Sequence, residues 1–205
     1  MKLFLVRHAE SFWNEQGRMQ GGLSDIPLSD LGKEQAMRIA TALEKEEISA
    51  ICSSNLKRAM ETAQAIAQLH QLGVEIDPDL REIEAGELEG ITLEELIAKH
   101  NNFWLSFKRG EVSLHFPGGE SLAEVQQRAW RAIQRIKEAH PDEVVVVVSH
   151  YYAILTIICR ALGVDLPAIT RLRQDRAAIS ILDFRGGNIV LTLLNNTCHL
   201  TNKGV

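Results

Sequence analysis

The sequence has no basic excess, no long apolar run and little cysteine. Its 205 residues include 22 lysines and arginines against 27 aspartates and glutamates, which gives a formal net charge of −5. Because no basic field is present to attract a polyanion, we expect no nucleic-acid partner. No stretch approaches the ~18 to 20 apolar residues that cross a bilayer, and the segment before Arg7 is too short for the apolar core of a signal peptide. These absences predict a cytoplasmic protein with no membrane partner.

The cysteines and histidines show no metal-binding pattern. Cys52, Cys159 and Cys198 are odd in number, far apart, and each lies in an apolar or small-residue context. We therefore predict three buried free thiols and no disulfide. The 7 histidines show no zinc spacing either, so we expect no metal and no cofactor.

Short apolar runs alternate with amphipathic segments along the chain. The apolar runs have the length of strands that are buried on both faces of a parallel sheet, and they cover residues 1–6, 48–52 and 144–148. Apolar residues recur at helical spacing over residues 30–46, 55–72 and 152–162. Two more helix starts carry capping boxes, Thr92 with Glu95 and Ser121 with Glu124, and the second opens a helix to residue 139. A Gly-rich turn at 185–188 between apolar arms at 177–184 and 189–194 predicts a β-hairpin.

This order of elements predicts an α/β fold, a three-layer helix-sheet-helix sandwich with a mostly parallel sheet. Residues 84–119 interrupt the alternation, and we interpret them as a small helical cap insertion. Its aromatic residues are Phe103, Trp104, Phe107 and Phe116. Packing within the cap is the favoured role for these rings, and lining a substrate pocket is the alternative. Because there is no repeat, low-complexity tract or Gly/Ser linker, we predict a single domain over residues 1–205.

Arg7 and His8 follow the first predicted strand directly. In open α/β sheets, ligands bind at the carboxyl ends of the strands. An arginine offers a permanently charged fork for phosphate oxygens, and a histidine is a nitrogen nucleophile that can be neutral near pH 7. An exposed, inert basic pair is the alternative interpretation.

Three more places put similar chemistry near strand ends. Arg58 lies just inside the helix after the second strand, where backbone N–H groups favour an anion. Glu82 lies on a loop, and His150 follows the most apolar strand of the chain. Taken singly, Arg58 could be a surface charge, Glu82 a partner of Arg81, and His150 a helix cap. The repeated junction of histidine with strand favours a common site.

Several motifs together resemble the histidine phosphatases, also called the phosphoglycerate-mutase-like superfamily. The matching segments span most of the chain: residues 5–11, 20–21, 25–29, 32–36, 53–54, 56–59, Glu82, 118–121 and 148–150. Ala9 stands where that superfamily usually has glycine. The resemblance implies hydrolysis of a small phosphorylated metabolite without a metal.

The resemblance also implies a role for each site residue. His8 would attack phosphorus and form a phosphohistidine, while Arg7, Arg58 and His150 would surround the equatorial oxygens. Glu82 would protonate the leaving oxygen and then deprotonate water, which requires burial and a raised pKa. Glu10 would orient groups of the site. Substrate binding is assigned to Asn14, Gln20, Gly21 and His199.

The resemblance favours the phosphatase branch over the mutases. Phosphoglycerate mutases carry a small hydroxyl residue at the place of Gln20, a tryptophan at that of Gly22, and a carboxylate-binding sequence where this chain has residues 83–86 (IEAG). Neither Glu84 nor Ala85 can bind a carboxylate. A phosphoglycerate mutase stays open as an alternative, as does a sensor that binds phosphoesters without turnover.

The physiological substrate is left open among several phosphomonoesters. Residues 88–90 resemble α-ribazole phosphatases, whereas the opening motif and residues 195–200 resemble metal-independent phosphoserine phosphatases. In the latter, a histidine usually stands at the place of Ala85, and a late histidine such as His199 helps to form the pocket. A surface position in a frayed terminus is the alternative for His199. Phosphoserine is the leading hypothesis, and a homodimer is an open possibility.

Overall fold

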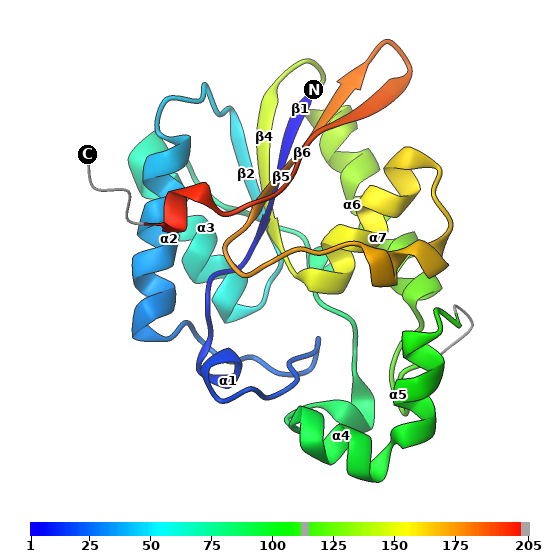
Figure 1. Cartoon of the computed structure of the whole chain (residues 1–205). Helices are drawn as coiled ribbons and strands as arrows, with labels where there is room; N and C mark the ends of the chain where they lie inside the picture. The colour runs from blue at the N-terminus through cyan, green and yellow to red at the C-terminus, as the bar shows by residue number, and fades with distance from the viewer. Residues whose placement is uncertain (112–114, 202–205) are drawn as a thin grey trace.

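The computed structural model describes residues 1–111 and 115–201 and has one six-stranded sheet. The strands are β1 (Lys2–Arg7), β2 (Ala50–Ser53), β3 (Glu75–Ile76), β4 (Val144–Ser149), β5 (Ile179–Arg185) and β6 (Asn188–Asn196). Their order is β3-β2-β4-β1-β5-β6 (Figure 1). Strands β1 to β4 run parallel, whereas β5 and β6 form an antiparallel edge. The predicted mostly parallel sheet is confirmed.

Three α-helices lie in the segments whose apolar spacing predicted them, residues 30–46, 55–72 and 152–162, whereas the short helix Phe12–Glu15 was not predicted. The α-helices are α1 (Phe12–Glu15), α2 (Asp30–Leu43), α3 (Lys57–His70), α4 (Leu93–Lys99), α5 (Asn101–Lys108), α6 (Leu122–Ala139) and α7 (Tyr151–Leu162). Short 3₁₀ turns are η1 (Pro78–Leu80), η2 (Gly86–Leu88), η3 (Leu166–Arg171) and η4 (Cys198–Leu200). Both predicted capping boxes are present, at the starts of α4 and α6.

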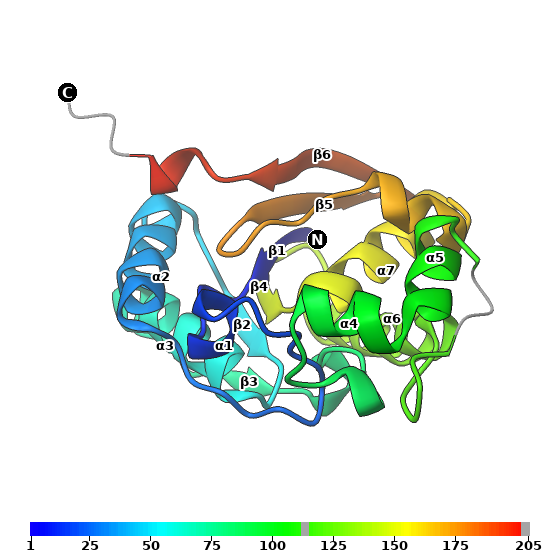
Figure 2. The ribbon, with the colours of Figure 1, turned by 60° about the horizontal axis from the view of Figure 1, so that its bottom comes forward.

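Apolar side chains project from both faces of the sheet, so helices pack against both faces. In β1, Phe4 and Val6 belong to the cluster under α2 and α3, whereas Leu3 and Leu5 belong to the cluster under α6 and α7. This alternation follows from the two-residue period of a strand. Figure 1 and Figure 2 show α2 and α3 on one side of the strands and α6 and α7 on the other. The predicted three-layer sandwich is confirmed.

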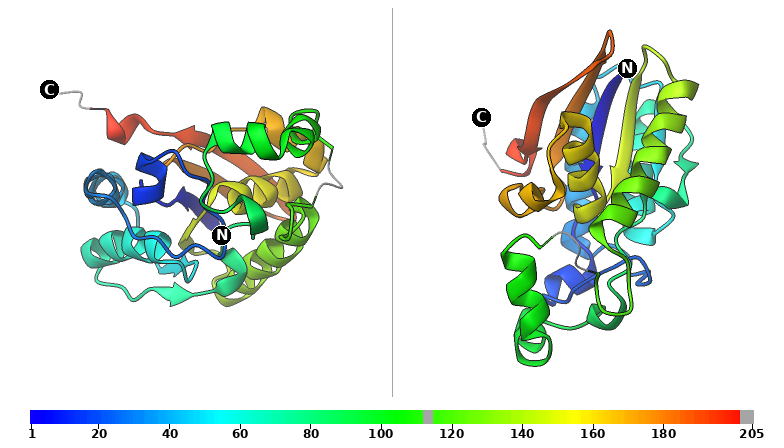
Figure 3. Two further views of the ribbon diagram at one scale, coloured as in Figure 1. Left: turned by 90° about the horizontal axis from the view of Figure 1, so that it is seen from below. Right: turned by 90° about the vertical axis from the view of Figure 1, so that its right-hand side faces the viewer.

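Helices α4 and α5 stand beyond the carboxyl ends of the parallel strands (Figure 3). The ring of Phe116 lies 5.0 Å from that of Phe103 and 5.5 Å from that of Tyr152. These rings join the cap aromatics to α7 and form part of a third apolar cluster. The contacts favour packing as the role of Phe103 and Phe116. Residues 112–114 of the expected insertion lie outside the described residues, as do 202–205 of the predicted domain.

The edge of the sheet agrees with the predicted hairpin. Arg185 pairs with Asn188 across a two-residue loop, in which Gly186 and Gly187 have φ angles of 51° and 93°. Two successive positive φ angles are what a tight hairpin turn requires and what glycine adopts readily. The prediction of three buried thiols is wrong in one case, because Cys198 in η4 is exposed while Cys52 and Cys159 are buried. None of the helices in the described ranges is long and apolar enough to cross a membrane.

Candidate active site

The parallel pairing of β1 with β4 brings the two strand-terminal histidines together. Arg7 is in register with Ser149, and the His8 N–H donates to the Ser149 carbonyl at 2.9 Å. The rings of His8 and His150 therefore stand side by side, with centroids 5.1 Å apart. Residues 142 positions apart in the chain meet because neighbouring parallel strands end at the same edge.

The contacts of His8 determine which of its nitrogens can react. Nδ1 lies 2.7 Å from the Ala9 carbonyl, which can only accept, so Nδ1 carries the proton and Nε2 holds a free lone pair. The side chain is buried. Burial, and then the charges of Arg58 and Arg7, hold the pKa of His8 well below its ordinary value of 6.5. His8 is thus a neutral imidazole whose Nε2 can act as a nucleophile.

His150 is fully buried and is held by one hydrogen bond. Its Nε2 lies 2.8 Å from Ser54 Oγ, and its Nδ1 has no partner among residues 1–111 and 115–201. It occupies the N-cap position of α7 without making a capping hydrogen bond, which excludes the cap interpretation. Burial, and then the charge of Arg58, also lower the pKa of His150. Its Nδ1 can offer an N–H to an anion when the Ser54 hydroxyl donates to Nε2.

Arg58 is completely buried in the first turn of α3, so it is no surface charge. Its Nη1 donates to the Ser24 carbonyl at 2.7 Å and its Nη2 to the Gly21 carbonyl at 3.1 Å. Its Nε is buried without a partner in the described part of the chain. Burial lowers the pKa of Arg58 to about 10. The guanidinium keeps its charge at neutral pH and has a donor free for an anion.

Arg7 is fixed by two contacts. Its Nη1 donates to the Gln174 carbonyl at 2.7 Å, and its guanidinium carbon lies 5.1 Å from the centre of the Tyr151 ring. As in Arg58, the Nε is buried and finds no partner within the described ranges. Two arginines and one histidine thus each present an unused buried nitrogen. Because buried donors are normally satisfied, this pattern indicates an anion-binding site.

Glu82 is buried in the loop between η1 and η2. Its carboxyl accepts the N–H of Ile83 at 3.0 Å and that of Tyr152 at 3.1 Å. Arg81 pairs with Glu84 at 2.5 Å instead, so the alternative of an Arg81–Glu82 pair is not what the structure has. Burial raises the pKa of Glu82 above its ordinary value of 4.5, and the two backbone N–H groups with Arg7 and Arg58 oppose that shift. A carboxyl group with a raised pKa can donate a proton.

The four predicted substrate-binding residues, Asn14, Gln20, Gly21 and His199, do not share the same contacts in the structure. Asn14 Oδ1 accepts the Ser11 N–H at 3.2 Å in the capping box of α1. Gln20 Oε1 accepts from Ser11 Oγ at 2.6 Å, while its buried Nε2 lacks a partner in the described residues. Gly21 has no room for a side chain, because a Cβ there would lie 2.8 Å from the Ile83 carbonyl oxygen and 2.9 Å from the Ala85 backbone nitrogen. Asn14 and Gln20 thus both contact Ser11, whereas Gly21 contacts Arg58 through its carbonyl.

His199 forms its hydrogen bond in another part of the structure. His199 lies in η4, and its Nε2 lies 3.0 Å from the Ala177 carbonyl. Burial lowers its pKa, and Arg38 of α2 acts in the same direction. His199 therefore holds η4 against the chain that follows Arg176.

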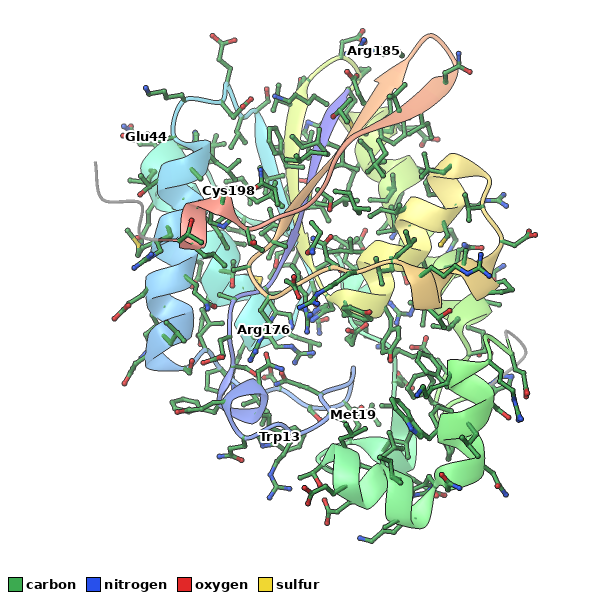
Figure 4. The ribbon with its side chains drawn as sticks, in the orientation of Figure 1. Trp13, Met19, Glu44, Arg176, Arg185 and Cys198 are labelled. Atoms are coloured by element: carbon green, nitrogen blue, oxygen red, sulfur yellow. The ribbon has the colours of Figure 1, made fainter. Side chains whose placement is uncertain are left out.

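Sequence reasoning missed Arg176, because no motif or periodic pattern marks residues 172–178. Its Nη1 lies 2.7 Å from Glu10 Oε2, and Ser29 Oγ donates to the other oxygen at 3.2 Å. Burial and the charges of Arg58 and Arg7 lower the pKa of His8, and the charge of Arg176 acts in the same direction. In Figure 4, Arg176 lies between the sheet and the segment that carries Trp13. A third, half-exposed cation thus stands beside Arg7 and His8.

Paired imidazoles, two buried guanidiniums and a protonatable carboxyl at the end of an α/β sheet define a class of protein, the enzymes that transfer phosphoryl groups through histidine. Comparison with known families agrees with this class. The family model described as "Histidine phosphatase superfamily (branch 1)" matches residues 3–197, and the chain belongs to this superfamily. Its fold and its phosphatase-named relatives make it a phosphomonoesterase.

Three similar proteins illustrate the relationship. Phosphoserine phosphatase 1 of Hydrogenobacter thermophilus is 38% identical over 200 residues, which cover 98% of this chain and 94% of the relative. "Probable phosphoglycerate mutase GpmB" of Escherichia fergusonii is 34% identical over 185 residues, covering 90% of this chain and 86% of the relative. A solved structure of a phosphoserine phosphatase mutant from Entamoeba histolytica, in complex with phosphoserine, has a TM-score of 0.87 and 32% identity, with 98% and 99% of the two chains covered.

Proposed function

We propose that the chain hydrolyses phosphoserine, through a phosphohistidine formed on His8. The observation that carries the chemistry is the free lone pair of His8 Nε2 beside three buried nitrogens without partners in the described residues, on Arg7, Arg58 and His150. The choice of phosphoserine is supported by the names of two similar proteins. Ala85 argues against it, because the resemblance to phosphoserine phosphatases calls for histidine there.

In the first step, His8 Nε2 attacks phosphorus in line with the serine oxygen. The N–P bond forms, the P–O bond breaks, and the proton of the Glu82 carboxyl moves to the leaving oxygen. The Nδ1–H bond to the Ala9 carbonyl stabilises the positive charge that develops on the ring. Arg7, Arg58 and His150 donate to the equatorial oxygens as charge builds up on them.

In the second step, Glu82 takes a proton from water, and the resulting hydroxide attacks phosphorus. The N–P bond breaks and returns its electron pair to Nε2, which restores the neutral imidazole. Serine and inorganic phosphate are the products, so phosphoserine and one water are consumed. Because side chains supply the positive charge around the phosphoryl group, the proposed reaction uses no metal.

The amide donors and the half-exposed cation complete the proposed site. The NH₂ groups of Asn14 and Gln20 would contact phosphate oxygens, since their carbonyl oxygens are already bound to Ser11. Arg176 would exchange Glu10 for the carboxylate of the substrate. Gly21 would act through its carbonyl, which holds Arg58. The roles of His199 as a pocket residue, of the cytoplasm as location and of a homodimer as assembly stay predictions.

The test compares His8→Ala with the parent protein on phosphoserine and on p-nitrophenyl phosphate, in excess EDTA. Phosphate release should disappear in His8→Ala and should persist in His140→Ala, whose ring lies at the end of α6 near Glu143. A parent reaction quenched in alkaline denaturant should contain phosphohistidine, because acid would hydrolyse its N–P bond. Full turnover by His8→Ala would refute the nucleophile, and inhibition by EDTA would refute the metal-free mechanism.

A panel of substrates distinguishes the alternatives. Release of phosphate from phosphoserine much faster than from α-ribazole phosphate or 3-phosphoglycerate supports the proposal. Interconversion of phosphoglycerates without free phosphate would identify a mutase instead. Phosphate binding without any turnover would identify a sensor.

A further inference from the structure

The loop that carries Glu82 has a support outside the proposed reaction centre. Arg128 of α6 is buried and donates to three backbone carbonyls, two of this loop and one of η1 directly before it. Its Nη1 lies 2.9 Å from the Asp79 carbonyl and 2.6 Å from the Arg81 carbonyl, and its Nη2 lies 2.9 Å from the Glu82 carbonyl. Residues 81–85 have no regular secondary structure of their own. The guanidinium therefore replaces the backbone pairing that a helix or strand would supply.

Glu120 completes the same support from the other side. Its two oxygens accept from Arg128 Nε and Nη2, both at 2.8 Å. One of them also accepts the Glu84 N–H at 2.9 Å, and the Glu120 N–H donates to the Glu84 carbonyl at 2.9 Å. The five N–H groups of one guanidinium thus meet five acceptors, which only the planar fork of arginine can do.

Close packing leaves this arrangement little freedom. A Cβ on Gly119 would lie 1.9 Å from the Glu84 carbonyl oxygen, so the two loops touch through their backbones. The side chains of Arg128 and Glu120 are 8% and 15% exposed, which keeps water from competing for the ion pair. Burial opposes the charge of Glu120, but its bonds with Arg128 and Glu84 lower its pKa overall. Glu120 is thus a carboxylate at neutral pH.

We infer that the Arg128–Glu120 pair is a positioning device, which sets where the Glu82 carboxyl stands relative to the leaving oxygen. Arg128 contacts the backbone of Glu82, and the carboxyl is left to the N–H groups of Ile83 and Tyr152. A substitution of Arg128 or Glu120 therefore shifts the backbone of Glu82, and with it the carboxyl group. This inference rests on the proposed function, because it takes Glu82 to be the general acid.

The dependence on the leaving group separates positioning from a merely structural role. An alkyl phosphate must have its leaving oxygen protonated, whereas p-nitrophenolate is stable enough to leave with little help. A displaced acid therefore slows alkyl phosphates selectively. A structural role would reduce the folded fraction and slow both substrates by the same factor. The ratio of kcat/KM for the two substrates is independent of the folded fraction.

The experiment measures kcat/KM for p-nitrophenyl phosphate and for an alkyl phosphate such as phosphoserine. In Arg128→Lys, which keeps the charge and loses the fork, the alkyl substrate should lose at least ~10-fold more than the aryl one, within the range of general acid catalysis. Glu120→Gln should show the same selectivity and serves if Arg128→Lys folds poorly. Arg135→Lys is the matched control on the same helix, because Arg135 is half-exposed and, among the described residues, binds the side chains of Asp77 and Asp79 and no backbone carbonyl of the Glu82 loop.

The Glu82→Gln variant distinguishes a failure of the positioning role from a failure of the proposed function. If it shows the selective loss and Arg128→Lys does not, the positioning role is wrong and the proposed function stands. If Glu82→Gln itself slows both substrates equally, Glu82 is not the acid and the proposed function fails first. An equal selective loss in Arg135→Lys would also overturn the inference.

Discussion

At the residue scale, the proposed chemistry depends on buried nitrogens that lack a hydrogen-bond partner in the described residues. Arg58 uses both Nη atoms on carbonyls of the loop that contains Gly21 and Ser24, and keeps Nε for a ligand. The bound carbonyls fix the direction in which the guanidinium points. A fixed donor stabilises a transition state without reorganisation during the reaction.

Replacing Arg58 by alanine should reduce kcat/KM for p-nitrophenyl phosphate more than ~10-fold, because a charge-assisted contact that strengthens in the transition state exceeds about 1.4 kcal/mol. Steady-state kinetics on the folded variant measure the effect. Arg160→Ala, which removes an exposed arginine of α7, is the control and should retain the parent rate. An unchanged rate in Arg58→Ala would mean that its Nε does not meet the phosphoryl group.

The pKa shifts of two groups predict the pH dependence of kcat/KM. The reaction needs neutral His8, whose pKa burial lowers below 6.5, and protonated Glu82, whose pKa burial raises above 4.5. The rate should fall as the pH drops through the pKa of His8 and fall again as the pH rises through that of Glu82. A bell-shaped profile with an acidic optimum is expected, and Glu82→Gln should lose the alkaline limb. A rate that rises steadily into alkaline pH would contradict the assignment.

The sequence predicts these site residues unequally. Arg7, His8 and His150 follow apolar strands, and the rule for strand ends needs only local patterns to find them. Arg128 and Arg176 act through contacts with carbonyls and a carboxylate that lie 46 and 166 positions away. No local pattern can reveal such partners. Ala9 illustrates the same limit, because the hydrogen bond from its N–H to Thr62 Oγ1, at 3.2 Å, appears only in the fold.

At the element scale, capping explains which helix ends could be predicted. The boxes at Thr92 and Ser121 use side chains three residues apart, so the sequence contains the whole device. Helix α3 begins at Lys57, whereas its apolar spacing suggested residue 55, and it has no side-chain cap of its own. The Lys57 N–H donates instead to Asp25 Oδ1 at 2.7 Å. The start of α3 is therefore set by a contact with a distant loop and cannot be predicted from the local sequence.

Ser121→Ala should lower the free energy of unfolding by ~1 kcal/mol, the usual cost of losing a serine N-cap. Ser121 Oγ accepts the Glu124 N–H at 3.3 Å, and its own N–H donates to Glu124 Oε2 at 2.8 Å. Urea unfolding measures the change. Gln134→Ala, at an exposed position of the same helix, should have little effect. Equal stabilities of the two variants would show that the cap contributes nothing to α6.

At the scale of the whole molecule, the site joins segments from both helical layers. Arg58 belongs to α3 on one face of the sheet, and His150 precedes α7 on the other. The three-layer fold follows from apolar periodicity, which the sequence contains. The closeness of the two rings, 5.1 Å apart, follows from the strand order, in which β4 lies beside β1.

A ligand that contacts both layers should therefore stabilise the entire fold. Inorganic phosphate at about 100 times its dissociation constant should add about 2.7 kcal/mol to the free energy of unfolding, because it binds the folded state alone. Thermal unfolding with and without phosphate, against sodium chloride of equal ionic strength, measures this gain as a rise in Tm. Arg58→Ala should abolish the rise and Arg160→Ala should retain it. Because a screening effect would act on all charges alike, an equal rise with sodium chloride or in Arg58→Ala would show that the buried nitrogens do not form one phosphate site.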